Sequence, residues 1–383
     1  VCTPHRAVVR LVRATNYMRF GPGEVSLHAA PLGFDASTLE VWGPLLNGGK
    51  LVLPTSETLS LEEISALVED YQVTTLWLTA GLFHAMVDEC YERLKPVRQL
   101  LAGGDVLSMP HLRKAQAILP ETQIINGYGP TEGTTFTCCH TFSELDWASA
   151  PIGKPISNTT IYVLDGDLQQ VPEGAVGELY IGGRGLARGY LNQPSLTAAS
   201  FIPNPFFDAQ RDALVDENMT LYRSGDQVRF RQGGVLEFLG RLDDQVKLRG
   251  FRIEPGEIES LLKERCDVRD SVVVALSDAT HPKRLVAYII TDVPDLDGAE
   301  LKKYLSEQLP PQMLPSHYEM VESFPLNNNG KVDRQRLPVP KWPSGEGTVA
   351  REASTRERTV QVVWESLLPC ESVGLYDNFF ELG

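Results

Sequence analysis

Residues 126–132, with the sequence NGYGPTE, combine two glycines, a proline, a hydroxyl and a carboxylate within one short stretch. They follow the run Gln123-Ile124-Ile125, which predicts a buried strand. One interpretation is a tight turn with a threonine helix cap, because Gly, Pro and Thr are common at such points. The other is a ligand loop at the C-terminal end of a strand in an α/β sheet, where such folds bind nucleotides.

Other ionisable residues stand in short polar stretches where they would be able to contact a ligand. Asp35 lies in GFDAS (33–37), and Lys331 follows a glycine in NNNGKVDR (327–334). Each has a simpler interpretation, since Asp35 would serve as a helix N-cap and Lys331 as an exposed turn lysine. The segment GRLDDQVKLRG (240–250) would likewise form a charged surface hairpin.

The composition indicates a globular, acidic protein. The chain has 383 residues, 42% of them hydrophobic, and a formal net charge of −15. A packed core is therefore expected, and the acidic balance disfavours a nucleic-acid partner. The chain shows neither a signal-peptide pattern nor an apolar run of membrane-spanning length, so we expect no membrane partner. The six scattered cysteines form no CxxC pair and indicate reduced thiols in a cytoplasmic protein.

Alternating helix and strand patterns predict the fold that positions these residues. LEEISALVEDY (61–71) and HLRKAQAIL (111–119) have helical spacing, whereas VTTLWL (73–78) and QII (123–125) are strand-like. This alternation predicts a parallel sheet covered by helices. From about Ile152, the runs TTIYVLDG and VGELYIGG predict a β-barrel-like subdomain.

A smaller α+β unit is predicted after the β subdomain. GEIESLLKER (256–265) and AELKKYLSEQL (299–309) have helical spacing, and SVVVAL (271–276) and RLVAYII (284–290) are short strands. PVPKWPSGEG (338–347) is rich in Pro and Gly and predicts a linker. Beyond it, Ser354 and Glu357 have the spacing of a capping box that starts another helix.

The ordered set of motifs resembles the adenylation domains of nonribosomal peptide synthetases, within the adenylate-forming superfamily of acyl-CoA synthetases and luciferases. The set comprises GFDAS, NGYGPTE, GELYIGGRGLARGYLN, YRSGDQVR, GRLDDQVKLRGFRIEPGEIE, LPPQMLP and NNNGKVDR, and the resemblance covers essentially the whole chain. It implies an α/β adenylate-forming fold with a smaller mobile C-terminal domain. The implied divisions are part of the large N-terminal subdomain (1–239), the small C-terminal subdomain (240–337), a linker (338–352) and the start of a carrier domain (353–383).

The resemblance implies that an amino-acid carboxylate is joined to the α-phosphate of ATP and then transferred to a carrier phosphopantetheine thiol. ATP and Mg²⁺ are the implied cofactors. Because no covalent protein nucleophile is needed, the side chains position and neutralise anions. Their implied roles are adenine and nucleotide contact (Tyr128, Gly129), phosphate contact (Thr131), Mg²⁺ ligation (Glu132), ribose contact (Asp226), ribose and phosphate contact (Arg241), a bridge between carboxylate and phosphate (Lys331), and a hinge (Asp243).

The resemblance also implies the substrate class. Asp35 would compensate the α-ammonium of an amino acid, which loses its hydration on entry. The implied side-chain pocket is uncharged and consists of Ala36, Leu39, Trp77, Leu101, Gly103, Gly127, Thr135 and Phe136. Trp77 and Phe136 would limit its depth, while Gly103 and Gly127 would leave some width. We therefore expect L-valine, with isoleucine or leucine as weaker substrates. Trp77 is the member that would most readily be an ordinary core residue instead.

Two further expectations concern the ends of the chain and the rival functions. By the resemblance, the chain begins where a Gly/Ser/Thr-rich phosphate loop should end, and DNFFELG precedes the absent phosphopantetheine serine. We therefore expect a fragment that is inactive by itself, from a synthetase with condensation and other domains. One alternative is an acyl- or aryl-CoA ligase, which Asp35 and the carrier-like tail disfavour. The other is an inactive scaffold, which Glu132, Asp226 and Lys331 disfavour for the parent protein and which the missing loop favours for this fragment alone.

Overall fold

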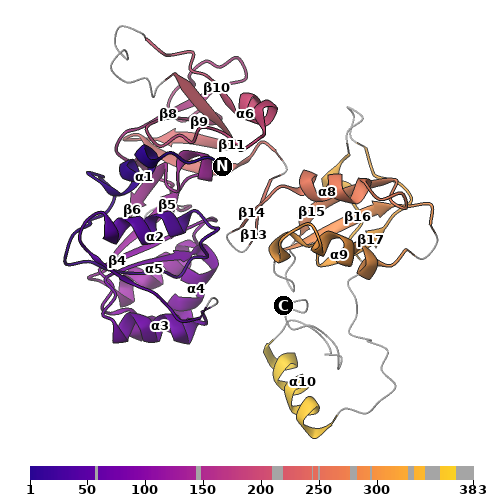
Figure 1. Cartoon of the computed structure of the whole chain (residues 1–383), viewed down its shortest axis with the longest axis horizontal. Coiled ribbons are helices and arrows are strands. Elements are labelled where there is room, and N and C mark those ends of the chain that lie inside the picture. Colours follow the sequence, from indigo (N-terminus) through magenta and orange to yellow (C-terminus); the bar gives the residue numbers. More distant parts are fainter. Residues whose placement is uncertain are drawn as a thin grey trace. The chain divides into compact units, whose positions relative to one another are not determined.

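The computed structural model of the chain describes residues 1–56, 59–143, 148–208, 219–243, 245–248, 251–276, 283–293, 296–326, 332–340 and 354–367. It divides into two compact units, Val1–Asp243 and Asp244–Gly383 (Figure 1). None of the helices in these described ranges is long and apolar enough to span a membrane.

A seven-stranded sheet forms the centre of the first unit, in the order β2-β1-β3-β4-β5-β6-β7. Neighbouring strands from β2 to β5 run parallel, whereas β6 is antiparallel to both β5 and β7. The strands are β1 (Val25–Leu27), β2 (Lys50–Val52), β3 (Thr75–Thr79), β4 (Gln99–Gly103), β5 (Gln123–Tyr128), β6 (Cys138–Thr141) and β7 (Lys154–Pro155). The parallel α/β core expected from the alternating pattern is confirmed, with an antiparallel edge that the pattern did not indicate.

Helices accompany the strands of this sheet and begin at recognisable caps. Ser60 and Glu63 form a capping box at the start of α3, and the Thr79 hydroxyl caps α4. Both caps satisfy backbone N–H groups that have no partner within the helix. The helical segments of this part are α1 (His5–Val12), α2 (Ala36–Leu45), α3 (Leu61–Asp70), α4 (Ala80–Glu89), η1 (Tyr91–Leu94), α5 (Met109–Ile118) and η2 (Thr131–Gly133).

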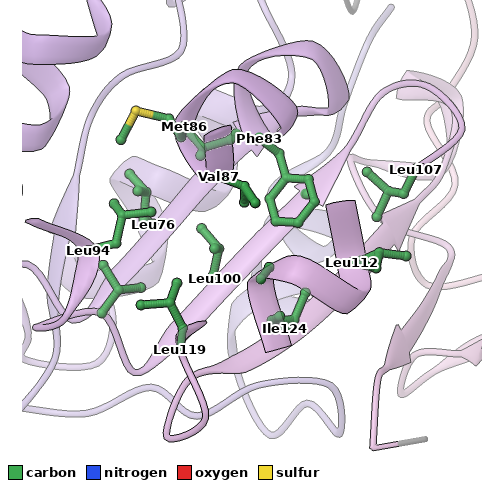
Figure 2. Close-up of a cluster of buried hydrophobic side chains, with 14 of the residues drawn as sticks. Leu76, Phe83, Met86, Val87, Leu94, Leu100, Leu107, Leu112, Leu119 and Ile124 are labelled. Carbon is green, nitrogen blue, oxygen red and sulfur yellow. The ribbon is translucent and has the colours of Figure 1, made fainter. Parts of the chain in front are cut away.

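The two faces of the central strands carry separate apolar clusters. Leu76, Leu100 and Ile124 pack with residues of α3, α4 and α5, including Phe83, as Figure 2 shows for α4 and α5. The next residue of each strand, namely Trp77, Leu101 and Ile125, belongs to a second cluster with residues of α1 and α2. Successive side chains of a strand point to opposite faces of the sheet. The candidate site lies on this second face.

An antiparallel sheet completes the first unit. Its order is β10-β11-β9-β8, and β12 pairs with β11. It consists of β8 (Thr159–Leu164), β9 (Val176–Gly183), β10 (Phe201–Pro203), β11 (Thr220–Arg231) and β12 (Val235–Arg241), with α6 (Pro194–Ser200) between β9 and β10. The two runs predicted as strands, TTIYVLDG and VGELYIGG, contain β8 and β9.

The second unit contains a small α+β fold. A hairpin of β13 and β14 precedes a three-stranded sheet in the order β15-β16-β17, and Ile258, Leu285 and Leu301 lie in its apolar core. Its elements are β13 (Val246–Leu248), β14 (Phe251–Ile253), α8 (Pro255–Lys263), β15 (Asp270–Leu276), β16 (Arg284–Ile290), α9 (Gly298–Ser306), η4 (Pro311–Met313), β17 (His317–Met320), η5 (Arg334–Arg336) and α10 (Thr355–Leu367). The predicted capping box at Ser354 and Glu357 forms at the start of α10. Most of the predicted linker lies outside the described residues.

Candidate functional site

The NGYGPTE segment begins within β5, and the loop of residues 129–137, which contains the rest of the segment, returns the chain to the sheet at β6. Tyr128 pairs with Cys138 in the antiparallel register, and the Thr137 N–H donates to the Tyr128 carbonyl at 2.7 Å. Between these strands, Thr131 to Gly133 form the short helix η2. Both ends of this loop are thereby fixed in neighbouring strands. It therefore connects two adjacent strands of the sheet and is not a turn that leads into an α-helix.

Two consecutive threonines in this loop have strained backbones. Thr134 has φ 59° and Thr135 has φ 62°, values at which a β-branched residue is rarely found. Each such residue costs about 1–3 kcal/mol and persists only where its surroundings hold it. The Thr134 hydroxyl donates to the Gly185 carbonyl at 2.7 Å, and the Thr135 hydroxyl donates to the Asp35 carbonyl at 2.8 Å. These bonds fix the loop to two distant parts of the chain.

Asp35 lies at the start of α2 and its carboxylate turns toward the loop. It makes no side-chain capping bond with α2, so the simple N-cap interpretation does not describe it. Its Oδ2 instead accepts a hydrogen bond from the Thr131 hydroxyl at 2.8 Å. The structure therefore brings together a carboxylate and a hydroxyl that are 96 residues apart in the chain.

A buried glutamate holds the segment that leads from β1 to Asp35. Glu40 of α2 accepts hydrogen bonds from the Ala29 and Ala30 N–H groups at 3.1 and 3.0 Å, and from His28 Nδ1 at 2.9 Å. The bond to Glu40 raises the pKa of His28. Burial raises the pKa of Glu40 although the same partners act in the opposite direction. Glu40 was not predicted from the sequence, where its only signal was a lone acidic residue within the apolar helix ASTLEVWGPL.

Five residues of the expected side-chain pocket lie in one apolar cluster on the second face of the sheet. They are Ala36, Leu39, Trp77, Leu101 and Phe136. The Trp77 ring packs against Phe34 with ring centroids 5.4 Å apart. Among the described residues, its indole N–H has no hydrogen-bond partner. Trp77 thus shares one environment with the other expected pocket residues.

The two expected pocket glycines do not open free space in the way the sequence suggested. A β-carbon on Gly127 would collide with the Phe136 ring, and one on Gly103 would collide with the Gly127 carbonyl. Gly103 and Gly127 are paired across β4 and β5. The absence of a side chain at Gly127 therefore makes room for Phe136, whose ring takes the expected width. This is a correction to the width inferred from the glycines.

A second group of expected residues links the two sheets of the first unit. The Tyr128 hydroxyl, at the end of β5, donates to Asp226 Oδ2 on β11. Arg241 Nη1 donates to Asp226 Oδ1 at 2.6 Å. The pKa of Tyr128 is raised well above its ordinary value, mainly by burial and to a smaller extent by the neighbouring Asp226 carboxylate. Each carboxylate oxygen accepts up to two hydrogen bonds, so the Asp226 oxygens retain capacity for a hydroxyl donor.

Arg241 also contacts the residue expected to act as a hinge. Its Nε and Nη2 donate to the two oxygens of Asp243 at 2.6 and 2.5 Å. Asp243 is the last residue of the first compact unit. Lys331, the expected bridge between carboxylate and phosphate, lies outside the described residues.

Glu132 is buried and its side chain is oriented by a tyrosine. It is 2% exposed, and its Oε1 accepts a hydrogen bond from the Tyr190 hydroxyl at 2.5 Å. The pKa of Tyr190 is raised to about 12, mainly by burial and to a smaller extent by the Glu132 carboxylate. Gly129, two residues after Gly127, passes close to the backbone of Thr135 and Thr137. Tyr190 was not predicted as a site residue, although it lies in the GELYIGGRGLARGYLN stretch that the sequence singled out.

Comparisons with known proteins match a large first part and a smaller second part of the chain, in that order. The profile of the AMP-binding enzyme family matches residues 1–191, and that of the AMP-binding enzyme C-terminal domain matches residues 257–331. A linear gramicidin synthase protein of Brevibacillus parabrevis is 49% identical over the whole chain, which covers 5% of that protein. The chain thus spans only a small part of the curated relatives that it matches.

Two solved structures illustrate the similarity in fold. One is holo-PA1221, described as an NRPS protein containing adenylation and PCP domains bound to a vinylsulfonamide inhibitor. It is 35% identical with a TM-score of 0.80, over all of this chain and 62% of that one. The other is Klebsiella oxytoca NpsA in complex with 3-hydroxyanthranilyl-AMSN. It is 30% identical with a TM-score of 0.58, over 88% of this chain and 67% of that one.

Proposed function

Since the chain belongs to the AMP-binding enzyme family, as an adenylation domain of a nonribosomal peptide synthetase, we propose that it activates L-valine as an aminoacyl-adenylate. We further propose that the activated residue passes to the phosphopantetheine thiol of a carrier domain in the same synthetase. On this proposal residues 353–383 begin that carrier domain, residues 338–352 are the linker, and condensation and other synthetase domains are the remaining partners.

The observation that carries the proposal is the position of Asp35 between two surroundings. The next residue, Ala36, belongs to the apolar cluster that also contains Phe136, and the Asp35 carboxylate contacts Thr131 of the NGYGPTE segment. An ammonium group that leaves water needs an anionic partner, and a carboxylate provides it. Asp35 would thus hold the α-ammonium with the side chain toward the apolar cluster and the carboxylate toward the loop.

The residues around Glu132 fit the Mg²⁺ that accompanies ATP. Within the described ranges, no group of three or more His, Cys, Asp and Glu residues would hold a metal by protein ligands alone. Mg²⁺ is commonly held by one or two carboxylates together with phosphate oxygens and water, so one oriented carboxylate suffices. When bound, the ion neutralises phosphate charge. Glu132 would be its protein ligand, and Tyr190 would hold the orientation of Glu132.

The nucleotide contacts follow from the link between the two sheets. Asp226 would accept hydrogen bonds from the ribose hydroxyls, and Arg241 would lie near the ribose and phosphate. Tyr128, joined to Asp226 through its hydroxyl, would place its ring near the adenine. Gly129 would allow the backbone to pass close to the nucleotide. These roles rest on the motif resemblance and are supported by the contacts among the side chains.

The chemistry requires positioning more than a protein nucleophile. A carboxylate oxygen of the amino acid attacks the α-phosphorus, the bond to the β-phosphate bridging oxygen breaks, and pyrophosphate leaves. Two anions must approach each other, so fixed cations and hydrogen-bond donors lower the barrier. Lys331 would bridge the carboxylate and the α-phosphate, and Thr131 would contact phosphate.

The uncharged, medium-sized cluster supports valine as the preferred side chain. Trp77, Leu101 and Phe136 present apolar surface, with the Phe136 ring placed over Gly127. A single methylene changes the discrimination by only about 1–3 kcal/mol, so isoleucine and leucine should be accepted more weakly.

Amino-acid-dependent ATP–pyrophosphate exchange tests the proposal, with the full-length synthetase module as the enzyme and each amino acid supplied in turn. Valine should give the highest kcat/KM, followed by isoleucine or leucine. Preference for an acidic, basic or aromatic amino acid would overturn the assignment of the pocket. Part of the proposal is that residues 1–383 alone form no adenylate, and the same assay on the isolated chain tests this part.

A further inference from the structure

Arg10 is a buried arginine that contacts the strained loop through backbone carbonyls other than the groups that contact Asp35. It lies in α1, is 3% exposed, and its guanidinium donates to three backbone carbonyls of the loop. The acceptors are Phe136 at 2.6 Å, Thr134 at 3.3 Å, and Gly133. In the described part of the chain, no carboxylate forms an ion pair with it.

Burial of this charge without a carboxylate is unusual and indicates a specific role. Isolated charges are seldom fully buried, because removing them from water is unfavourable. Burial lowers the pKa of Arg10 to about 10, a value at which the guanidinium remains charged at neutral pH. Charge-assisted hydrogen bonds to carbonyls compensate in part. The planar fork of a guanidinium matches several fixed acceptors at once, which an ammonium cannot do in the same way.

The surroundings are shaped to admit the guanidinium. A β-carbon on Gly185 would collide with its Cζ and Nη2 atoms. The Gly185 carbonyl accepts the hydrogen bond from the Thr134 hydroxyl at 2.7 Å. One glycine therefore provides space for Arg10 and also an anchor for the first strained threonine.

The loop that Arg10 contacts supplies two residues of the expected side-chain pocket, Thr135 and Phe136. Thr135 is bonded to the Asp35 carbonyl, and the Phe136 ring fills the space over Gly127. The Phe136 ring also packs edge-on against Tyr17, with centroids 5.7 Å apart. A left-handed conformation at two successive non-glycine residues persists only while such contacts hold it. Release of the three carbonyls would let Thr135 and Phe136 shift together.

We propose that Arg10 is a positioning residue that determines amino-acid specificity: it fixes the carbonyls of residues 133, 134 and 136 and so sets where Thr135 and Phe136 stand. The inference rests on the proposed function for its catalytic readout. It assigns to α1 an effect on the substrate side chain, although Arg10 itself does not touch the substrate.

The test uses the full-length synthetase module with Arg10→Lys, Arg10→Ala and Gly185→Ala. Arg6→Ala is the matched control, because Arg6 is an exposed arginine on the same helix. The first readout is backbone hydrogen exchange of residues 133–137 without substrate, which reports on the loop whatever the enzyme catalyses. Exchange should be about tenfold faster in Arg10→Ala and Gly185→Ala, since hydrogen bonds to a charged group are lost, and unchanged in Arg6→Ala.

The second readout is the kinetics of ATP–pyrophosphate exchange with valine, alanine and isoleucine as substrates. Arg10→Lys keeps the charge but loses the fork, so the KM for valine should rise at least about fivefold. The KM for ATP should change by less than about twofold, because the loop walls face the amino acid. The ratio of kcat/KM between valine and alanine should fall as well. A merely structural role would lower kcat for all substrates equally and leave these ratios unchanged.

A double variant separates folding from positioning. If Gly185→Ala acts by displacing the guanidinium, it should add little to Arg10→Ala, because the same contact is already lost. Should Arg10→Ala fail to fold, Arg10→Lys and Gly185→Ala decide the question. Unchanged hydrogen exchange and unchanged substrate ratios in both would overturn the role of Arg10 while leaving adenylation intact. Absence of amino-acid-dependent ATP–pyrophosphate exchange in the wild type would instead contradict the proposed function. The hydrogen-exchange measurement would still decide by itself whether Arg10 fixes the loop.

Discussion

The Thr131 hydroxyl donates a hydrogen bond to the Asp35 carboxylate at 2.8 Å. One contact thereby joins the residue proposed to hold the substrate ammonium to a residue proposed to contact phosphate. Asp35 would contact the ammonium directly and would reach the phosphate subsite only through this one bond, so a change at Asp35 should affect the binding of the amino acid more than that of ATP.

Replacement of Asp35 by Asn should therefore reduce kcat/KM for valine strongly. The pair would be buried once the amino acid is bound, and loss of one partner of a buried ion pair costs about 3–5 kcal/mol, which corresponds to roughly 150- to 4,000-fold. The KM for ATP should change much less. ATP–pyrophosphate exchange measures both constants, and Asp70→Asn, an exposed carboxylate at the end of α3, is the control. Normal valine kinetics in Asp35→Asn would remove Asp35 from ammonium binding.

Removal of the Tyr190 hydroxyl should weaken the proposed Mg²⁺ site without removing Glu132, its proposed ligand. In Tyr190→Phe the Glu132 carboxylate loses the donor that orients it at 2.5 Å. A hydrogen bond to a charged group contributes about 1.5–3 kcal/mol, so we expect at least about tenfold more Mg²⁺ for half-maximal exchange. The pKa of Tyr190 is raised to about 12, so the wild-type donor stays protonated at neutral pH.

The matched control for that experiment is Tyr162→Phe, since Tyr162 lies on β8 and stacks on Phe206 with centroids 4.7 Å apart. It should leave the Mg²⁺ dependence unchanged. An identical Mg²⁺ titration in Tyr190→Phe and wild type would show that Tyr190 has no part in holding Glu132.

Stability should depend on pH through His28. The bond to Glu40 raises the pKa of His28 above its ordinary value of 6.5. The protonated form is thus favoured in the folded state. Its contribution is fully present below pH 6.5 and is lost as the pH rises through the folded-state pKa. The free energy of unfolding lost in His28→Gln should therefore be larger near about pH 6 than near about pH 8.5.

Urea denaturation at the two pH values measures this difference. His5→Gln is the control, because His5 is an exposed histidine on α1. A loss that is equal at both values, or larger at the alkaline one, would show that the His28–Glu40 bond does not involve a charged imidazole.

Fixing the backbone of Asp243 should separate the two half-reactions. Proline holds φ near about −65° and removes the freedom that a hinge needs. Asp243→Pro should slow either adenylation or thiol transfer far more than the other. Asp243→Ala is the matched control, because it loses the bonds from Arg241 but keeps the backbone freedom. Equal effects of Pro and Ala on both half-reactions would assign the role to the ion pair alone.

Lys331→Ala should impair adenylation by on the order of 10²–10³ in rate, the usual effect of losing one preorganised charge-stabilising donor. Thiol transfer from a supplied aminoacyl-adenylate should remain nearly normal. The half-reactions are assayed separately, and Lys303→Ala, an exposed lysine on α9, serves as control. If Lys331→Ala adenylates normally, or loses both steps equally, the proposed bridge between carboxylate and phosphate fails.

Local patterns in the sequence predicted the elements well, because short-range physics determines them. The strand predicted over residues 73–78 overlaps β3, where Leu76 and Trp77 belong to clusters on opposite faces because of the two-residue period of a strand. The predicted capping box at Ser354 depends only on residues three apart. The family resemblance supplied the roles of the site residues, which periodicity alone does not contain.

Contacts between distant segments could not be predicted from local patterns. The bond between Thr131 and Asp35 joins residues 96 apart, and the bond between Arg10 and Phe136 joins residues 126 apart. No local spacing encodes such a partner, since it depends on which elements the fold brings together. Tyr190 was missed for the same reason. The width expected at Gly127 was wrong because the neighbour that fills it comes from the segment that leads into the next strand.

The reversal of strand direction between β5 and β6 has a consequence for how such a pocket diversifies. A loop anchored at both ends in adjacent strands of opposite direction cannot slide lengthwise without breaking both ladders. If the proposed pocket binds an amino acid, a larger or smaller one should therefore be accommodated by exchanges of individual wall residues rather than by a shift in register. Changes in substrate preference should thus arise by replacements of single wall residues while the backbone of the loop stays constant.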